Sequence, residues 1–245
     1  VVVIFMFIAG TNFTLIYFGL KLKFTKLLKN DEFKWYISAL VIVISALSVF
    51  HFFTVNSSNL LNSFRVISFQ VVSIITTTGY ATDDYTLWGP FLSFIFFLFL
   101  FSGASAGSTS GGIKIVRIVL LMKNSLLEFK RRLHPKAVIP LNLNGKNVSG
   151  QITYNLLAFI FLYLFIFTVG SLILTFIGVD FLTSISAVAS AIGNVGPGIG
   201  SVGPAASFSH LPDLAKWILS ILMLMGRLEL FTVCLLLTPY FWKRI

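Results

Sequence analysis

Long runs of apolar residues separated by short charged segments form the dominant pattern of this chain. A helix that crosses a bilayer needs roughly 20 mostly apolar residues. Runs of that length without Asp, Glu, Lys or Arg occupy residues 1–20, 35–64, 85–113 and 148–179. We therefore predict membrane-spanning helices at 35–55, 90–122, 150–179 and 212–241, with residues 1–20 as the end of a descending helix.

Two shorter segments are too polar to face lipid along their whole length. Residues 60–76 mix apolar positions with Ser, Asn, Arg and Gln, and residues 181–192 hold the corresponding place in the second half of the chain. Such a segment is tolerated at membrane depth when protein surrounds it. We interpret both segments as short re-entrant helices.

Each re-entrant segment leads into a turn that contains glycine, and the two turns lie 117 positions apart. The first reads Thr76-Thr77-Thr78-Gly79-Tyr80, and the second reads Gly193-Asn194-Val195-Gly196-Pro197. The same offset aligns Phe64 with Phe181, Ser73 with Ser190 and Thr78 with Val195. A short helix that points at such a turn between two spans can present backbone carbonyls to a dehydrated cation. Glycine adopts dihedrals that are closed to other residues. An ordinary Thr-rich turn would explain one copy, but recurrence in register favours a pore.

The repeat predicts an all-α integral membrane protein, with units of span, re-entrant pore helix, filter loop and span. Residues 1–34 would be the end of a preceding inner helix and its cytoplasmic connection, with Asp31 capping the next helix. Residues 35–149 would form one pore repeat with a cytoplasmic linker, and residues 150–245 the next. A K⁺ channel-like pore with pseudo-fourfold symmetry needs four units, so we expect half a ring here and further sequence upstream.

Composition and charge placement agree with a membrane protein. Hydrophobic residues make up 57% of the chain, charged residues 11%, and the mean hydropathy is +0.94, whereas soluble domains carry about a quarter charged residues. The net charge of +10 comes from basic clusters that the positive-inside rule places in the cytoplasm. These clusters hold Lys21, Lys23, Lys26, Lys29, Lys34, Lys114, Arg117, Lys123, Lys130, Arg131, Arg132, Lys136, Lys146, Lys243 and Arg244. Since topology explains them, we expect no nucleic-acid partner.

A segment rich in glycine and serine interrupts the predicted span at 90–122. Residues 103–112 read GASAGSTSGG, which cannot hold a straight helix against lipid. Close helix packing through small residues is the alternative. The repeat offset places Ser110 over Arg227, an ionisable residue within an apolar run and therefore a functional candidate. A pair between Arg227 and Glu229 is a poor alternative, because helix neighbours two positions apart face different ways.

Four motifs, in this order, resemble those of one known family. They are SIITTTGYATDDYTLWGP, GASAGSTSGGIKIVR, SAIGNVGPGIGSVGP and MLMGRLELFT. Together they resemble the Trk/Ktr/HKT superfamily of potassium transporters, most of all its bacterial TrkH branch. The resemblance covers essentially the whole chain and corresponds to the C-terminal half of the family's four repeats.

The resemblance implies a K⁺-translocating subunit of the bacterial cytoplasmic membrane, with K⁺ as the transported ion and no cofactor in this chain. The implied filter carbonyls belong to Thr77, Thr78, Gly79, Tyr80, Asn194, Val195, Gly196 and Pro197, with K⁺ at Thr77, Thr78, Asn194 and Val195. The implied gate comprises Gly103, Gly107, Ser108, Thr109, Ser110, Gly111, Gly112 and Arg227. The implied partners are membrane lipid, a second copy of the subunit, and a cytoplasmic nucleotide-binding ring similar to TrkA or KtrA. Any nucleotide would bind only to that ring.

Two other classes of function compete with a pore. A membrane enzyme would need paired carboxylates or a Ser/His or Cys/His arrangement at membrane depth, and the sequence offers none, so we expect no catalytic residues. The segment Gly198–Gly203 matches a dinucleotide pattern, but Pro204 follows where a helix should continue. A non-conducting sensor or assembly subunit on the same repeat is the remaining alternative, and glycines in both filter turns argue against it.

Overall fold

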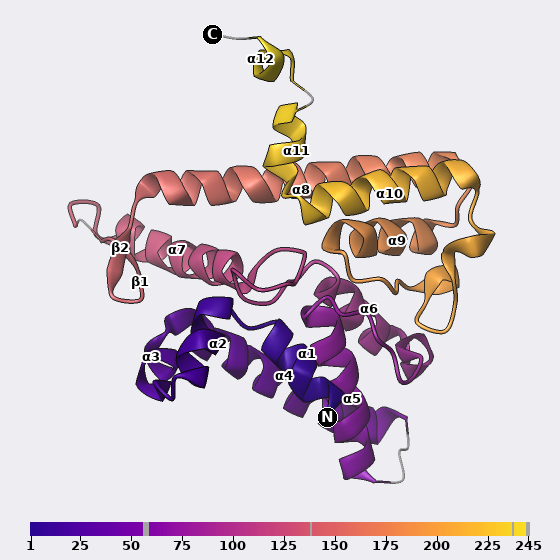
Figure 1. Ribbon diagram of the computed structural model, residues 1–245, viewed down its shortest axis with the longest axis horizontal. Coiled ribbons are helices and arrows are strands. Elements are labelled where there is room, and N and C mark those ends of the chain that lie inside the picture. The colour runs from indigo at the N-terminus through magenta and orange to yellow at the C-terminus, as the bar shows by residue number, and fades with distance from the viewer. Residues whose placement is uncertain (56–58, 138, 237, 244–245) are drawn as a thin grey trace.

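The computed structural model describes residues 1–55, 59–137, 139–236 and 238–243, and most of these residues are helical (Figure 1). The chain begins with α1 (Val2–Ala9), α2 (Phe13–Leu20) and α3 (Phe24–Lys29). The next elements are α4 (Asp31–Thr54), α5 (Leu60–Ile75), η1 (Tyr85–Trp88), α6 (Pro90–Phe99), α7 (Ile115–Leu133), β1 (Leu141–Leu143) and β2 (Lys146–Val148). The last are α8 (Gly150–Phe176), α9 (Phe181–Gly193), η2 (Gly200–Val202), η3 (Phe208–His210), α10 (Asp213–Arg227), α11 (Leu230–Leu236) and α12 (Pro239–Trp242).

Two helices of the described chain are long and apolar enough to cross a membrane, namely α4 and α8. They confirm the helices predicted at 35–55 and 150–179. The shorter apolar helices α5 and α9 fall on the two predicted re-entrant segments. In α9 every residue from Ser186 to Gly193 is buried, and the last six residues of α5 are buried as well. Protein therefore surrounds the ends of both helices that lead into the glycine turns.

The apolar segments at the two ends of the chain are broken, so the predictions of continuous helices at 1–20 and 212–241 were wrong. The chain bends by 117° between α1 and α2, and by 112° between α10 and α11. At the first break, the side chain of Asn12 caps α2 by accepting a hydrogen bond from the Thr14 amide, 2.8 Å away. At the second, Glu229 takes a left-handed conformation with φ 67°. The Asn12 cap and the left-handed Glu229 are local features at which the helix restarts in a new direction.

The predicted span at 90–122 is also interrupted, and the interruption is longer than the segment 103–112 that the sequence indicated. The helix α6 ends at Phe99 and α7 starts at Ile115, so the non-helical part spans residues 100–114. Figure 1 shows this loop in the middle of the molecule, with α8, α9 and α10 on one side and α1, α4, α5 and α6 on the other. The helix α7 packs against both α4 and α8. The loop is thus positioned to contact both halves.

The predicted cytoplasmic linker contains a small β-hairpin that the sequence analysis did not foresee. The strands β1 and β2 are antiparallel, with Leu141 opposite Val148, and Asn144 and Gly145 both have positive φ at the turn. Such a turn suits a two-residue hairpin. The expectation that Asp31 caps α4 was wrong, because Asn30 accepts the hydrogen bond from the Phe33 amide. Asp31 instead exchanges hydrogen bonds of 2.6 and 2.7 Å with Asn144 and ties the hairpin to α4.

Candidate ion pathway and gate

The two glycine turns are anchored to their helices in the same way. The Thr78 amide donates to the Ser73 carbonyl oxygen at 2.8 Å, and the Val195 amide donates to the Ser190 carbonyl oxygen at 3.0 Å. These pairs are related by the repeat offset of 117 residues. Each serine is almost fully buried. Each helix therefore ends by folding its next turn back onto an equivalent buried serine.

The backbone of the two turns also follows one pattern. Left-handed conformations occur at Thr77 (φ 53°) and Gly79 (φ 79°), and again at the aligned Asn194 (φ 55°) and Gly196 (φ 112°). When left-handed and right-handed backbone conformations alternate along a segment, consecutive carbonyls can point to the same side. In a regular strand, successive residues point to opposite sides. The turns thus share the backbone property that a carbonyl filter requires.

The two turns lie against each other. A Cβ atom added to Gly79 would lie 2.2 Å from the Val195 carbonyl oxygen, closer than any real side chain tolerates. The α5 and α9 helices both end at this point, so the negative ends of their dipoles favour a cation there. One predicted ligand differs from the rest, because the Tyr80 carbonyl oxygen already accepts a hydrogen bond from the Ser73 hydroxyl at 2.6 Å. Its role as a K⁺ ligand stays a prediction.

The loop at 100–114 lies directly beside both turns. The Gly111 amide donates to the Thr77 hydroxyl at 2.8 Å. A Cβ atom on Gly111 would lie 2.2 Å from the Gly193 carbonyl oxygen, so backbone meets backbone here. Within the loop, the Ser108 hydroxyl bonds to the Ser105 carbonyl and to the Ser110 hydroxyl. The loop is therefore an ordered structure that contacts both glycine turns.

The first helix break holds one side of this loop. The Ser105 amide donates to the Gly10 carbonyl, and the Phe13 amide donates to the Gly107 carbonyl, both at 3.1 Å. Asn12 donates through its side chain to the Ala106 carbonyl at 2.6 Å. Buried Glu32, in the first turn of α4, accepts from the Ala106 amide at 2.5 Å. Backbone groups exposed by the break between α1 and α2 are thus satisfied by the loop.

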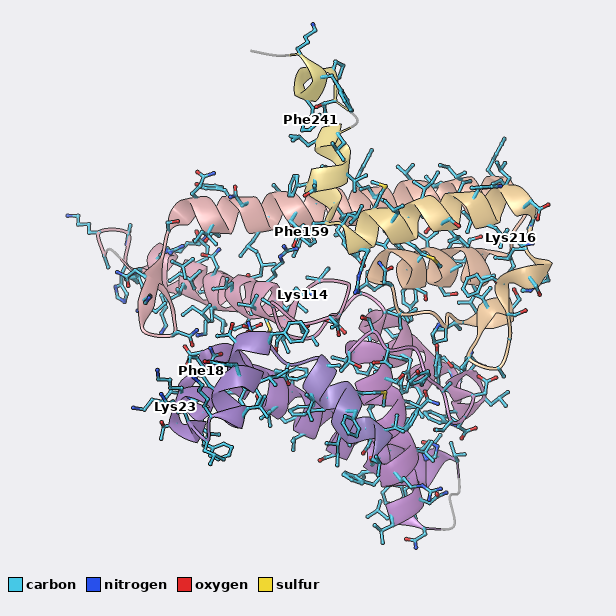
Figure 2. The ribbon with its side chains drawn as sticks, in the orientation of Figure 1. Phe18, Lys23, Lys114, Phe159, Lys216 and Phe241 are labelled. Carbon is cyan, nitrogen blue, oxygen red and sulfur yellow. The ribbon has the colours of Figure 1, made fainter. Side chains whose placement is uncertain are left out.

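The second helix break holds the other side. Arg227, the last residue of α10, donates from Nη1 to the Thr109 carbonyl oxygen at 2.7 Å. Glu229 pairs with Arg117 across 3.7 Å, and the Arg117 guanidinium lies 3.8 Å from the centre of the Phe159 ring. Lys114 bonds to the carbonyl and hydroxyl of Ser110. Figure 2 shows Lys114 and Phe159 near the centre of the molecule, where the two halves meet.

A cavity of about 340 Å³ separates this loop from the second break. Its wall includes the predicted gate residues from Gly107 to Gly112 together with Arg227. The sequence analysis assigned no role to Asn12 or Glu32, and it placed Lys114 only among the cytoplasmic basic residues. Glu32 lies among charged neighbours in the sequence, between Asp31 and Lys34, so only its contact with Ala106 in the structure singles it out. The partners of Asn12 and Lys114 likewise depend on the fold.

Comparisons with known proteins agree on one family. A family model described as "TrkH: Cation transport protein" matches residues 1–243. The Trk system potassium uptake protein TrkI of Halomonas elongata is 38% identical over 89% of this chain and 44% of that protein. TrkH of Escherichia coli K12 is 37% identical over 99% of this chain and 50% of that protein. The crystal structure of the potassium transporter TrkH from Vibrio parahaemolyticus superposes with a TM-score of 0.91, at 35% identity, over 98% of this chain and 52% of that one. The chain thus spans about half the length of these relatives.

Proposed function

This chain belongs to the TrkH family of cation transport proteins, and we propose that it supplies half of a K⁺-selective uptake pore in the bacterial cytoplasmic membrane. The observation that supports the proposal most is the pair of matching filter turns. Both fold back onto a buried serine, both carry left-handed residues at equivalent positions, and Gly79 contacts the Val195 carbonyl oxygen. Backbone carbonyls arranged in this way replace the hydration shell of a dehydrated cation.

In this proposal K⁺ is coordinated by carbonyls of Thr77, Thr78, Asn194 and Val195, with Gly79, Tyr80, Gly196 and Pro197 completing the filter. Because the carbonyls belong to the backbone, the two segments can differ in side chains and still provide similar ligands. Thr77 also bonds to Gly111, so the filter is linked to the loop below it. A movement of the loop would then shift Thr77 and so alter the filter.

The gate of the proposed pore is the loop at 100–114 together with Arg227. Hydrogen bonds from the α1–α2 break fix one side of the loop and the Arg227–Thr109 bond fixes the other. Opening requires at least one of these attachments to release. We place the controlling partner in the cytoplasm, as a nucleotide-binding ring that pulls on α7, and expect the pore subunits to pair as a homodimer surrounded by lipid.

Ion flux through the complete protein tests the function. The full-length protein is purified and reconstituted into liposomes that contain K⁺. Uptake of tracer Rb⁺ and of tracer Na⁺ into these liposomes is then measured. We expect Rb⁺ to accumulate and Na⁺ to accumulate far less. A non-conducting sensor subunit on the same fold predicts no uptake of either ion above that of empty liposomes, and that result would contradict the proposal.

A further inference from the structure

The loop at residues 81–89, which follows the first filter turn and contains η1, reaches the end of the second filter turn. Tyr85 has no exposed surface, and its ring stacks on Phe96 with 4.8 Å between ring centroids and 12° between planes. The Tyr85 hydroxyl donates to the Gly198 carbonyl oxygen at 2.7 Å, across 113 residues of sequence. Burial, with a smaller contribution from the Asp84 carboxylate, raises the pKa of Tyr85. The hydroxyl therefore keeps its proton and remains a donor at physiological pH.

The residue that accepts this bond directly follows the second filter segment. Gly198 comes after Pro197, and its amide donates to the Val202 carbonyl oxygen at 2.7 Å. A Cβ atom on Gly198 would lie 2.8 Å from the Val202 side chain, so the Gly198 backbone packs closely against its neighbours. The Tyr85 bond thus holds the residue at which the chain leaves the second filter segment.

The loop that carries Tyr85 is held by contacts with α4 and α5, which we call the brace and which involve Gln70, Asp83, Trp88 and His51. The Gln70 amide group donates to the Asp83 carbonyl oxygen at 2.7 Å, and the Trp88 indole donates to the Asp83 carboxylate at 3.3 Å. The His51 and Trp88 rings pack in a T-shaped arrangement, with 4.7 Å between centroids. Helices α4 and α5 therefore set the place of the loop that carries Tyr85.

The second repeat does not have the same brace. The repeat offset puts Ala187 at the place of Gln70, Gly200 at that of Asp83 and Val202 at that of Tyr85. In that repeat Ser186 holds the loop, accepting from the Ile199 amide at 3.0 Å and donating to its carbonyl at 2.7 Å. None of these replacements can donate as a phenol does. The position of the second segment relative to the first therefore depends on a side chain from the first repeat.

We propose that Tyr85 is a specificity-determining positioning residue, which fixes the second filter segment against the first through its bond to Gly198. This inference rests on the proposed K⁺ pore. Selectivity for K⁺ over Na⁺ depends on the number and spacing of the carbonyls that meet the ion. Without the hydroxyl, the Gly198 carbonyl is left buried without this partner, and the segment shifts to find another.

The test is Tyr85→Phe in the full-length protein, which removes one oxygen atom and keeps the ring. In liposomes that contain the purified variant, we expect the ratio of Rb⁺ to Na⁺ uptake to fall about fivefold, the size expected from one buried hydrogen bond. Tyr36→Phe is the matched control. Tyr36 is equally buried, and its hydroxyl has no hydrogen-bond partner among the residues that the structure describes. We expect this variant to keep the parental ratio.

The outcomes separate the inference from the proposed function. A Tyr85→Phe protein that is monodisperse, conducts Rb⁺ and keeps the parental ratio overturns the positioning role and leaves the pore intact. If Tyr85→Phe does not fold, Phe96→Leu replaces it as the test, since it loosens the Tyr85 ring while keeping its hydroxyl. A lower ratio in Phe96→Leu would then support the role, and an unchanged ratio would overturn it. A parent protein that takes up no Rb⁺ overturns the pore itself.

Discussion

The guanidinium group of Arg227 donates a hydrogen bond of 2.7 Å to the carbonyl oxygen of Thr109, 118 residues earlier in the chain. It joins the point where α10 breaks to the loop that interrupts the preceding repeat. A cation that meets a backbone carbonyl at this depth satisfies both groups, where either alone would be costly. The bond is therefore a direct mechanical connection between two inner segments of the proposed pore.

Replacing Arg227 with Ala should open the proposed gate. Losing a charge-assisted bond frees the Thr109 side of the loop, and we expect Rb⁺ uptake by liposomes without the regulatory partner to rise about tenfold. The selectivity should remain, because the filter is not altered. Lys216→Ala is the control, since Lys216 lies on the same helix and pairs only with nearby Asp213 at 3.1 Å among the described residues. Arg227→Ala protein that folds and conducts no faster than the parent would make the contact a packing feature.

The opposite side of the loop can be released separately through Asn12. In Asn12→Ser the shorter side chain can still cap α2 through the Thr14 amide but cannot reach the Ala106 carbonyl. We expect uptake without the partner to rise about threefold, less than for Arg227→Ala because a neutral bond is lost. Glu32→Leu removes the other side-chain contact to Ala106 and should act in the same direction. If both variants conduct like the parent while Arg227→Ala conducts faster, the first break does not restrain the loop.

The two filter glycines should differ in their tolerance of a side chain. Gly79 and Gly196 both have positive φ, but a Cβ on Gly79 would meet the Val195 carbonyl at 2.2 Å, whereas one on Gly196 lies 3.9 Å from its nearest atom. We expect Gly79→Ser to reduce the Rb⁺/Na⁺ ratio more than Gly196→Ser, with about tenfold and threefold losses from clash and backbone strain. Gly145→Ser is the control, because this hairpin glycine has positive φ and open space around it. Unchanged ratios in both filter variants would remove the filter assignment.

The sidedness of the chain can be tested with single cysteines in a Cys234→Ala background. The positive-inside rule places Lys130 in the cytoplasm and the outer loop with Leu87 outside. Both positions are exposed. An impermeant thiol reagent applied to whole cells should label Leu87→Cys and leave Lys130→Cys unlabelled until the cells are opened. Labelling of position 130 alone in intact cells would reverse the arrangement.

Much of the fold could be predicted from local patterns in the sequence. A span is determined by a run of apolar residues and a re-entrant helix by a shorter mixed run, and both signals are contained within one segment. The alignment of Ser73 with Ser190 also predicted a shared turn, and both serines do accept the equivalent backbone bond. Mean hydropathy did not reveal the breaks after Ala9 and Arg227, because each bend holds only a few polar residues, Thr11 and Asn12 in one and Arg227 and Glu229 in the other, between apolar runs.

Local sequence patterns are enough to locate the long helices α4 and α8, the two glycine turns and the loop that interrupts a predicted span, since each of these features depends on neighbouring residues. The groups that meet across the molecule could be found only in the folded chain: Asn12 with Ala106, Arg227 with Thr109, and Tyr85 with Gly198. The physical reason is that a helix break at membrane depth exposes backbone groups that must find partners. The sequence shows which residues permit a break, but the partners come from segments about 100 residues away, and only folding brings them within hydrogen-bond distance.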